Sequence, residues 1–306
     1  MSRIAWVDVF AAAGAMSGNP LAVVLDAADW PEARMQAFAA ELGLSETTFV
    51  VPSTTGADHR VRIFTPVREL PMAGHPIVGT AWVLHAARRI GERAVLETGA
   101  GDLPVRVQGR VATMDQATPE AGPLVDAAEI GDALGMEPLP DPPAQVWSTG
   151  VRQLMVRAPS AEALAGLRPD HDAVARLGDR DGWIGVSAYV LLDPPEGRIR
   201  VDVRHFAPLV GVPEDPVTGS AAGALGACLA AAGVGAEGDL ELVVCQGSSM
   251  GRPGEVAVRV ASEGGTPRRV RVGGRVVPLF EGRVLEGRPA AGGPAAGGPA
   301  ASRGGR

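Results

Sequence analysis

The stretch RIFTPVRELPMAGHP at residues 62–76 decides the fold, because a weaker copy, VRHFAPLVGVPEDPV, lies at residues 203–217. The shared positions Phe64, Pro66 and Pro71 recur 142 residues later as Phe206, Pro208 and Pro213. Each copy opens into a long segment rich in alanine, glycine and leucine. A unit that recurs in this way indicates a chain built from two related halves.

The residues on either side of the two copies predict the same order of elements in each half. In the first half we expect strands at 3–10, 21–26, 45–51 and 61–64, helices at about 31–43 and 76–89, and strands up to about 115. In the second half we expect strands at 147–158, 187–192 and 198–206, helices at 160–167 and about 218–232, and closing strands. The sequence therefore predicts an α+β fold of two β-rich units, each around one helix.

The helix that follows each copy is apolar on nearly every side, which is typical of a buried helix. The first turn of such a helix leaves N–H groups without partners. Gly74-His75-Pro76 and Thr218-Gly219-Ser220 stand at the two starts. Each could be an ordinary start, capped by His75 or Thr218. Two starts that face one cleft would instead form an anion site, suited to the carboxylate of a small acid.

Charge and composition exclude several classes of function. The 306-residue chain carries a net charge of −7, so we do not expect nucleic acid as a partner. All 28 basic residues are arginine, which excludes lysine Schiff bases and the P-loop lysine. Cys228 and Cys245 fit core thiols in a reducing compartment. We expect no export signal, no membrane span and a cytoplasmic protein.

The chain divides into three parts by repeat and composition. We expect an N-terminal barrel domain at residues 1–118 and a C-terminal barrel domain at 119–286, whose last strands could cross back to the first domain. Residues 287–306, GRPAAGGPAAGGPAASRGGR, have low complexity and no apolar periodicity, and we expect them to be disordered.

Five segments spread over residues 4–280 are similar to one family. They are GNPLAVVLDA, LGLSETTFV, RIFTPVRELPMAGHPIVGTA, FAPLVGVPEDPVTGSAAGALGACL and QGSSMGRPG. The chain resembles the PhzF-like isomerases of phenazine biosynthesis. The resemblance implies the diaminopimelate epimerase-like fold, with two pseudo-symmetric domains that each wrap a β-barrel-like sheet around a central helix. It also implies a homodimer.

The related racemases and epimerases that use two thiols carry a cysteine just before the glycine of each helix start. Here those positions hold Ala73 and Pro216. Cys228 lies three turns along its helix and cannot replace either thiol. Two-base cysteine chemistry is therefore excluded.

The resemblance implies a set of site residues instead. Glu46 would be the acid/base, and His75 and Asp215 would assist proton movement. The substrate-binding residues would be Ser45, Gly74, Gly219 and Ser220. Each key residue has a structural alternative: a solvated strand residue for Glu46, a helix cap for His75 and a turn residue for Asp215. The other histidines show no metal-ligand spacing, and we expect no metal.

The repeat itself supports Glu46. Setting Phe49 against Tyr189 puts Glu46 against Val186, and an apolar residue is what a purely structural strand carries at such a position. A carboxyl desolvated in an apolar cleft has a pKa near working pH, so it can take a proton and return it.

The resemblance implies a cofactor-independent isomerase that moves a proton and a double bond on a small cyclic amino or carboxylic acid, similar to trans-2,3-dihydro-3-hydroxyanthranilate isomerase. One alternative is the isomerase of another antibiotic precursor, and another is a non-catalytic homologue that binds a small acid. A G-x-S-x-G match at residues 247–251 would indicate a serine hydrolase only if a helix followed it, and the strand-like EVAVRV follows instead.

Overall fold

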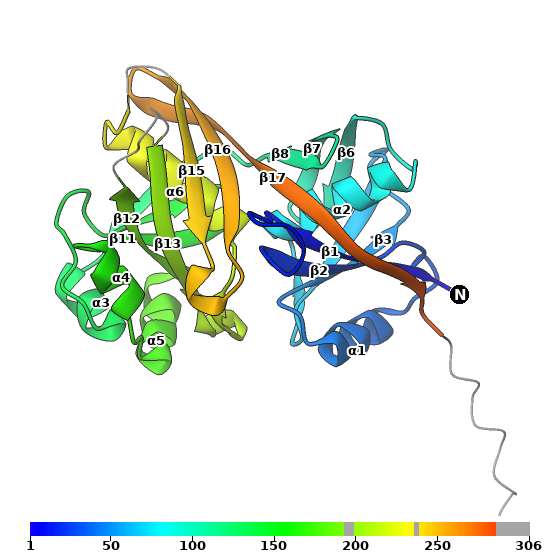
Figure 1. Ribbon diagram of the computed structural model, residues 1–306, viewed down its shortest axis with the longest axis horizontal. Helices are drawn as coiled ribbons and strands as arrows, with labels where there is room; N and C mark the ends of the chain where they lie inside the picture. Colours follow the sequence, from blue (N-terminus) through cyan, green and yellow to red (C-terminus); the bar gives the residue numbers. More distant parts are fainter. Residues whose placement is uncertain (193–198, 236–238, 286–306) are drawn as a thin grey trace, which may run out of the picture.

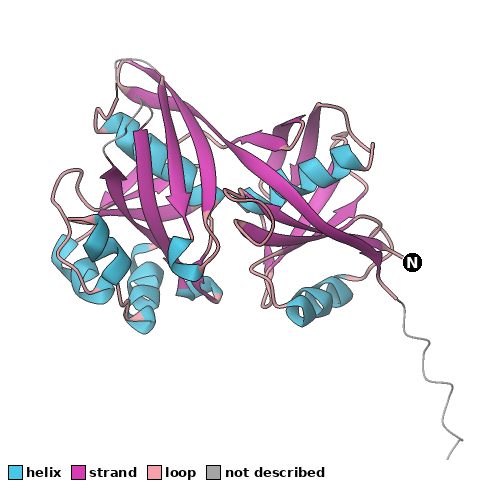
Figure 2. Ribbon diagram, in the orientation of Figure 1, coloured by secondary structure: helices cyan, strands magenta, loops and turns pink. Residues whose placement is uncertain are grey.

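The computed structural model describes residues 1–192, 199–235 and 239–285, which form two halves lying side by side (Figure 1). The tail expected at 287–306 lies outside the described residues. Figure 2 shows strands wrapped around one helix in each half, with the other helices on the outside. The predicted α+β fold is therefore confirmed.

The first half follows the expected order of elements. Its strands are β1 (Arg3–Val9), β2 (Asn19–Val24), β3 (Thr47–Val51), β4 (His59–Phe64), β5 (Glu69–Leu70), β6 (Arg93–Thr98), β7 (Gly101–Gln108) and β8 (Val111–Asp115). Its helices are α1 (Glu32–Leu42) and α2 (Gly74–Ala86). Gly43 ends α1 in the left-handed conformation that glycine adopts readily. Helix α2 begins at Gly74 rather than at about residue 76, so the motif glycine is part of its first turn.

The second half contains helices that the sequence did not lead us to expect. Its strands are β9 (Glu120–Leu124), β10 (Gln145–Ser148), β11 (Arg152–Arg157), β12 (Gly185–Leu192), β13 (Ile199–Ala207), β14 (Val212–Asp215), β15 (Leu240–Gln246), β16 (Gly254–Glu263) and β17 (Thr266–Arg283). Its helices are α3 (Ala127–Leu134), α4 (Ala161–Gly166), α5 (His171–Asp181) and α6 (Gly219–Ala231). The unexpected ones, α3 and α5, are capped by Asp126 and Asp170. They bury a separate apolar cluster on the outer face of the strands.

The two halves repeat the same strand pairing. Strand β3 runs parallel to β2 and antiparallel to β4, and β4 runs parallel to β6. In the second half, β12 runs parallel to β11 and antiparallel to β13, and β13 runs parallel to β15. The internal repeat of the sequence is therefore a repeat of the sheet.

The register of these strands corrects one detail of the sequence comparison. The phenylalanine shared by the two motif copies pairs with Thr47 on β3 and with Val186 on β12. Thr47 and Val186 are therefore counterparts, and so are the residues before them, Glu46 and Gly185. The comparison that set Glu46 against Val186 was wrong by one residue, because it matched Phe49 with Tyr189. These two residues pair with Arg62 and Val203, which are not equivalent positions of the two motif copies.

Strand β17 joins the halves. It pairs with β16 in the second half and with β8 and β1 in the first, and Figure 1 shows it running from one half to the other. The domain boundaries at 118 and 286 stay a prediction.

Helices α2 and α6 occupy the interiors of the two halves. Every residue of α6 from Gly219 to Leu229 is buried. A Cβ on Gly79 of α2 would lie 2.5 Å from Leu21 Cδ2 and 2.6 Å from Val9 Cγ2, so the sheet packs directly on the helix backbone. Within the described ranges, none of the helices has the length and apolar character needed to cross a membrane.

Candidate active site

The first turns of α2 and α6 meet where the two halves touch. A Cβ on Gly74 would lie 2.7 Å from the backbone N of Ser220 and 2.9 Å from the carbonyl carbon of Gly219. The N-cap residues are Ala73 and Thr218, and neither helix has a side-chain cap. The interpretation of these segments as ordinary capped starts is therefore wrong. N–H groups at a helix start without a side-chain cap can bind an anion.

A cavity of about 260 Å³ opens beside the two helix starts. The first half contributes Glu46 and residues 70–73 to its walls, and the second half contributes residues of β11, β13 and β14 together with Thr218 and Ser220. Most of the lining is apolar, with a few polar groups among it. That combination and size are typical of a site for one small molecule.

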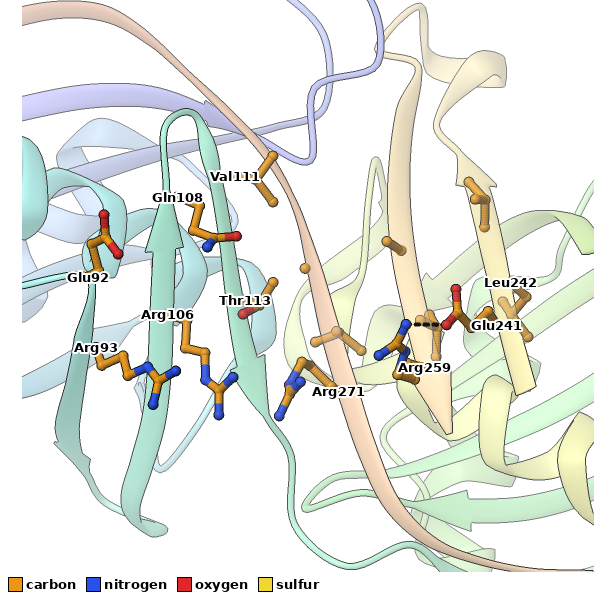
Figure 3. A pocket seen from close by; sticks show the side chains of 15 residues that line it. Glu92, Arg93, Arg106, Gln108, Val111, Thr113, Glu241, Leu242, Arg259 and Arg271 are labelled. Atoms are coloured by element: carbon orange, nitrogen blue, oxygen red, sulfur yellow. Dashed lines mark hydrogen bonds and ion pairs between the residues drawn. The ribbon is translucent and has the colours of Figure 1, made fainter. Parts of the chain in front are cut away.

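A larger groove of about 410 Å³ lies on the sheet face built from β6–β8 and β15–β17 (Figure 3). It is lined by arginines such as Arg93 and Arg106 and by the ion pair of Arg259 with Glu241. None of the residues expected to handle protons lines this groove. The smaller cavity is therefore the candidate active site.

Asn19 is the residue that holds the two halves of the site together. Its buried side-chain NH₂ group lies 2.9 Å from Asp215 Oδ1, 2.9 Å from the carbonyl oxygen of Val217 and 3.1 Å from His75 Nδ1. Its Oδ1 accepts a hydrogen bond of 3.2 Å from Ser45 Oγ. Asn19 was not among the site residues that the sequence led us to expect. The GNPLAVVLDA segment, which carried part of the family resemblance, was the available signal.

The contact with Asn19 bears on the tautomer of His75. The Asn19 NH₂ group has two hydrogens for three neighbours, of which Asp215 Oδ1 and the Val217 carbonyl can only accept. When Asn19 donates to His75 Nδ1, the neutral ring carries its proton on Nε2. Nε2 lies 3.5 Å from Glu46 Oε2, and both atoms are buried without another hydrogen-bond partner in the described residues. In that tautomer the imidazole N–H faces the Glu46 carboxyl.

Burial sets the charges of the three groups. Burial, with the charge of Asp215 adding to it, raises the pKa of Glu46 to about 8. Burial raises the pKa of Asp215 to about 6, although hydrogen bonds from Thr218 and Asn19 act against this. Burial lowers the pKa of His75 to about 3. At pH 7 the site therefore holds a protonated Glu46, an ionised Asp215 and a neutral His75, and Glu46 titrates close to working pH.

Asp215 is fixed by its own half of the molecule. Its Oδ2 accepts a hydrogen bond from Thr218 Oγ1, and its backbone oxygen accepts one of 2.7 Å from Gln246 Nε2. The Thr218 hydroxyl is thus committed to Asp215 and leaves the start of α6 uncapped. The interpretation of Asp215 as a turn residue is wrong, because Asp215 is the last residue of β14 and is 7% exposed.

A model of the family described as "Phenazine biosynthesis-like protein" matches residues 7–282. The chain belongs to this family. It is 37% identical over 284 residues to trans-2,3-dihydro-3-hydroxyanthranilate isomerase of Pseudomonas fluorescens, an alignment that covers 91% of this chain and 98% of the relative. A crystal structure of a PhzF-family protein from Bacillus anthracis matches with a TM-score of 0.83 and 28% identity, over 93% of this chain and 99% of the other.

A solved structure with much lower sequence identity shares the fold. A probable proline racemase from Agrobacterium radiobacter matches with a TM-score of 0.63 over 93% of each chain, at 12% identity. That identity supports the fold alone, and it confirms the expected epimerase-like architecture. The relatives at 37% identity are named as isomerases, and this PhzF-family protein is an isomerase.

The PhzF-family isomerase brings all the expected site residues into one region. Glu46, Asp215 and Ser220 line the cavity. His75 and Ser45 lie behind it, where His75 contacts Glu46 and Ser45 bonds to Asn19. Gly74 and Gly219 form the contact between the helix starts.

The thiols of this isomerase lie elsewhere. Cys228 is buried in α6, and burial raises its pKa to about 12. The residue directly before Gly219 is Thr218, so the sequence comparison that used Pro216 was wrong in position although not in outcome. In the described ranges, no group of three or more His, Cys, Asp or Glu side chains could hold a metal ion.

The G-x-S-x-G segment does not form a nucleophile elbow. Strand β15 leads into a single 3₁₀ turn at Ser248–Met250 and then into β16. The Ser249 hydroxyl donates a hydrogen bond of 2.8 Å to Glu214 at an exposed site. An elbow requires a helix after the serine, so serine hydrolase chemistry has no structural basis here.

Proposed function

We propose that this isomerase moves a proton and a double bond on a small cyclic amino or carboxylic acid without a cofactor. The observation that carries the proposal is the buried contact of Glu46 with His75, 3.5 Å long, at a cavity beside two uncapped helix starts. A titratable carboxyl and an anion site in one small cavity are what such a reaction requires.

The proposed reaction needs only the residues of this chain. The substrate carboxylate binds the N–H groups at the starts of α2 and α6. Ionised Glu46 takes a proton from a C–H bond next to the unsaturated part of the ring, and the electron pair of that bond shifts the double bond. Another ring atom then takes the proton back from the Glu46 carboxyl. The neutral His75 N–H stabilises Glu46 in its ionised form. Atoms and electrons balance, so no redox partner is needed.

We propose trans-2,3-dihydro-3-hydroxyanthranilate, or a precursor of similar chemistry, as the substrate. The support is the name of the Pseudomonas fluorescens relative. The same proton shift on this ring gives an enol, which becomes an amino-ketone. An unsaturated cyclic amino acid from another antibiotic pathway would satisfy the same chemistry.

The test of this function is Glu46→Gln in deuterated water. The amide keeps the size of the side chain but cannot pick up and return a proton, so turnover should fall by about a hundred-fold or more. Affinity for a ring carboxylate should change much less, because the helix starts bind it. The wild type should place deuterium in product or in unreacted substrate, unless the transfer is fully internal.

The matched control is Glu41→Gln, because Glu41 is an exposed residue of α1 and should tolerate the change. Near-normal turnover of Glu46→Gln would remove Glu46 from the mechanism and make Asp215 the candidate base. A wild type that binds a ring acid and neither converts it nor exchanges its protons would favour the non-catalytic alternative.

Two further expectations belong to this proposal. Turnover should survive dialysis against EDTA, and loss of activity that a metal ion restores would contradict cofactor independence. The family resemblance also leads us to propose a homodimer. Light scattering would test it, since the chain itself is 31.3 kDa.

A further inference from the structure

The cavity has a second polar region on the side of the second half. Gln153 on β11 and His205 on β13 line it, with Gly185 on β12 between them. Gln153 pairs with Gly185 across β11 and β12, and His205 pairs with Asp215 across β13 and β14. His205 pairs with Ser187, which lies two residues from Gly185 on the same face of β12, so these residues run diagonally across the sheet from Asp215 to Gln153.

One of these buried polar groups, the Gln153 side-chain oxygen, lacks a hydrogen-bond partner in the part of the chain that the structure describes. Gln153 is 2% exposed, and its Oε1 is buried without a hydrogen bond in the described residues. His205 is also 2% exposed, and its Nδ1 is 2.9 Å from Ser187 Oγ. A buried acceptor without a partner costs about 1–3 kcal/mol, so a structural role does not account for Gln153.

Gly185 creates the space that these groups face. A Cβ at this position would lie 2.6 Å from His205 Nε2 and 2.9 Å from Gln153 Oε1. Any other residue would therefore displace both side chains. Gly185 is the counterpart of Glu46, so the two halves differ in chemistry at the same point of the repeat.

We propose that Gln153 and His205 form a polar subsite that selects ring acids carrying a hydroxyl or amino donor away from the carboxylate. This inference rests on the proposed function, because it takes the helix starts as the carboxylate site. Gln153 Oε1 accepts the donor hydrogen bond. An apolar group of the same size leaves Oε1 unpaired and is rejected. Burial lowers the pKa of His205 to about 4, so the imidazole is neutral and the subsite favours an uncharged substituent.

The experiment compares pairs of ligands by calorimetry. Benzoate, the three hydroxybenzoates and the three methylbenzoates are titrated into the wild type, since a methyl group matches a hydroxyl in size. At least one hydroxybenzoate should bind about tenfold or more tightly than its methyl counterpart. In Gln153→Met the preference should disappear or reverse, because methionine has similar length and no strong acceptor.

The matched control is Gln108→Met, because Gln108 is exposed on β7 and does not line the cavity. The hydroxyl preference should persist in that variant. Gly185→Ala should weaken binding of the preferred hydroxybenzoate about tenfold or more, whereas Gly166→Ala should not, since a Cβ on Gly166 meets nothing within 4 Å. Melting curves check that each variant is folded.

Two outcomes would overturn the subsite: hydroxyl and methyl ligands that bind the wild type equally, or a preference that survives in both Gln153→Met and His205→Leu. Failure of all benzoates to bind would instead count against the carboxylate site of the proposed function. The two hypotheses therefore fail in different ways.

Discussion

The two halves of the molecule share a sheet pattern and a central helix, yet they supply different chemistry to the cavity. In the first half, Glu46 lies directly before β3, and the His75 ring contacts its carboxyl. In the second half the same position is Gly185, with Gln153 and His205 around the missing side chain. A repeated scaffold thus places a titratable carboxyl on one wall of the cavity and neutral polar side chains on the other.

The starts of α2 and α6 also differ in the atoms that surround their glycines. This difference gives the largest effect that we expect on kcat/KM. A Cβ on Gly74 meets the backbone N of Ser220, whereas a Cβ on Gly219 meets the Phe10 ring at 3.0 Å. Backbone cannot yield as a side chain can, so Gly74→Ala should separate the helix starts. We expect kcat/KM to fall about a hundred-fold or more, because small misplacements of binding groups are costly. In Gly219→Ala, kcat/KM should fall about tenfold or less.

Steady-state kinetics and melting curves measure both variants. Gly91→Ala serves as control, since the nearest atom to its Cβ is 3.8 Å away. Equal losses in Gly74→Ala and Gly219→Ala would break the proposed inequality between the two starts.

The pH dependence of kcat/KM tests whether Asp215, in the second half, raises the pKa of Glu46, in the first. Glu46 must be ionised to take a proton, so kcat/KM should rise with pH and level off above about pH 8, the pKa of Glu46. Asp215 contributes to that raised pKa, so Asp215→Asn should move the rise to lower pH by about one unit or more. A pH–rate profile measures the shift. If kcat/KM of the variant rises at the same pH as that of the wild type, the charge of Asp215 does not affect the pKa of Glu46.

The smallest expected effect concerns stability. The pKa of Glu46 is raised from 4.5 to about 8 in the folded protein, so the folded state holds this proton more tightly than the unfolded state. Stability is therefore lost as pH rises from about 4.5 to about 8. Glu46→Gln removes this cost, and its Tm should exceed that of the wild type by about 5 °C at pH 8. Calorimetry at pH 5, where the difference should vanish, provides the comparison.

Sequence reasoning predicted most of the fold because the signals were local and repeated. The all-apolar helices and the glycines at their starts predicted where α2 and α6 begin within two residues. Helices α3 and α5 were missed although aspartate caps precede them. Helix α5 lies between the parallel strands β11 and β12 as α1 lies between β2 and β3, but the helix predicted at 160–167 already occupied that place in the expected order. Which residues of β3 and β12 are equivalent depends on how each strand pairs with its own neighbours. Spacing along the chain could not determine this equivalence.

The site was predicted less completely, for a similar reason. Glu46, His75 and Asp215 come from the family resemblance, and the structure brings them together. Asn19 was missed because its importance lies in contacts 56 and 196 residues away along the chain. Gln153 and His205 carry no motif at all, and only the cavity and the missing Cβ of Gly185 bring them to notice.

The path of β17 has a consequence for how the protein is made. Strand β1 at the N-terminus pairs with β17, with Arg3 opposite Arg283 and Val9 opposite Val276. Residues of β17 are synthesised after all the other described strands, so the edge of β1 that they cover stays open until then. The first half therefore cannot complete its sheet before β17 is made, and its exposed edge is a place for a chaperone or for mispairing with another nascent chain. Folding of both halves ends with one event, the docking of the last strand.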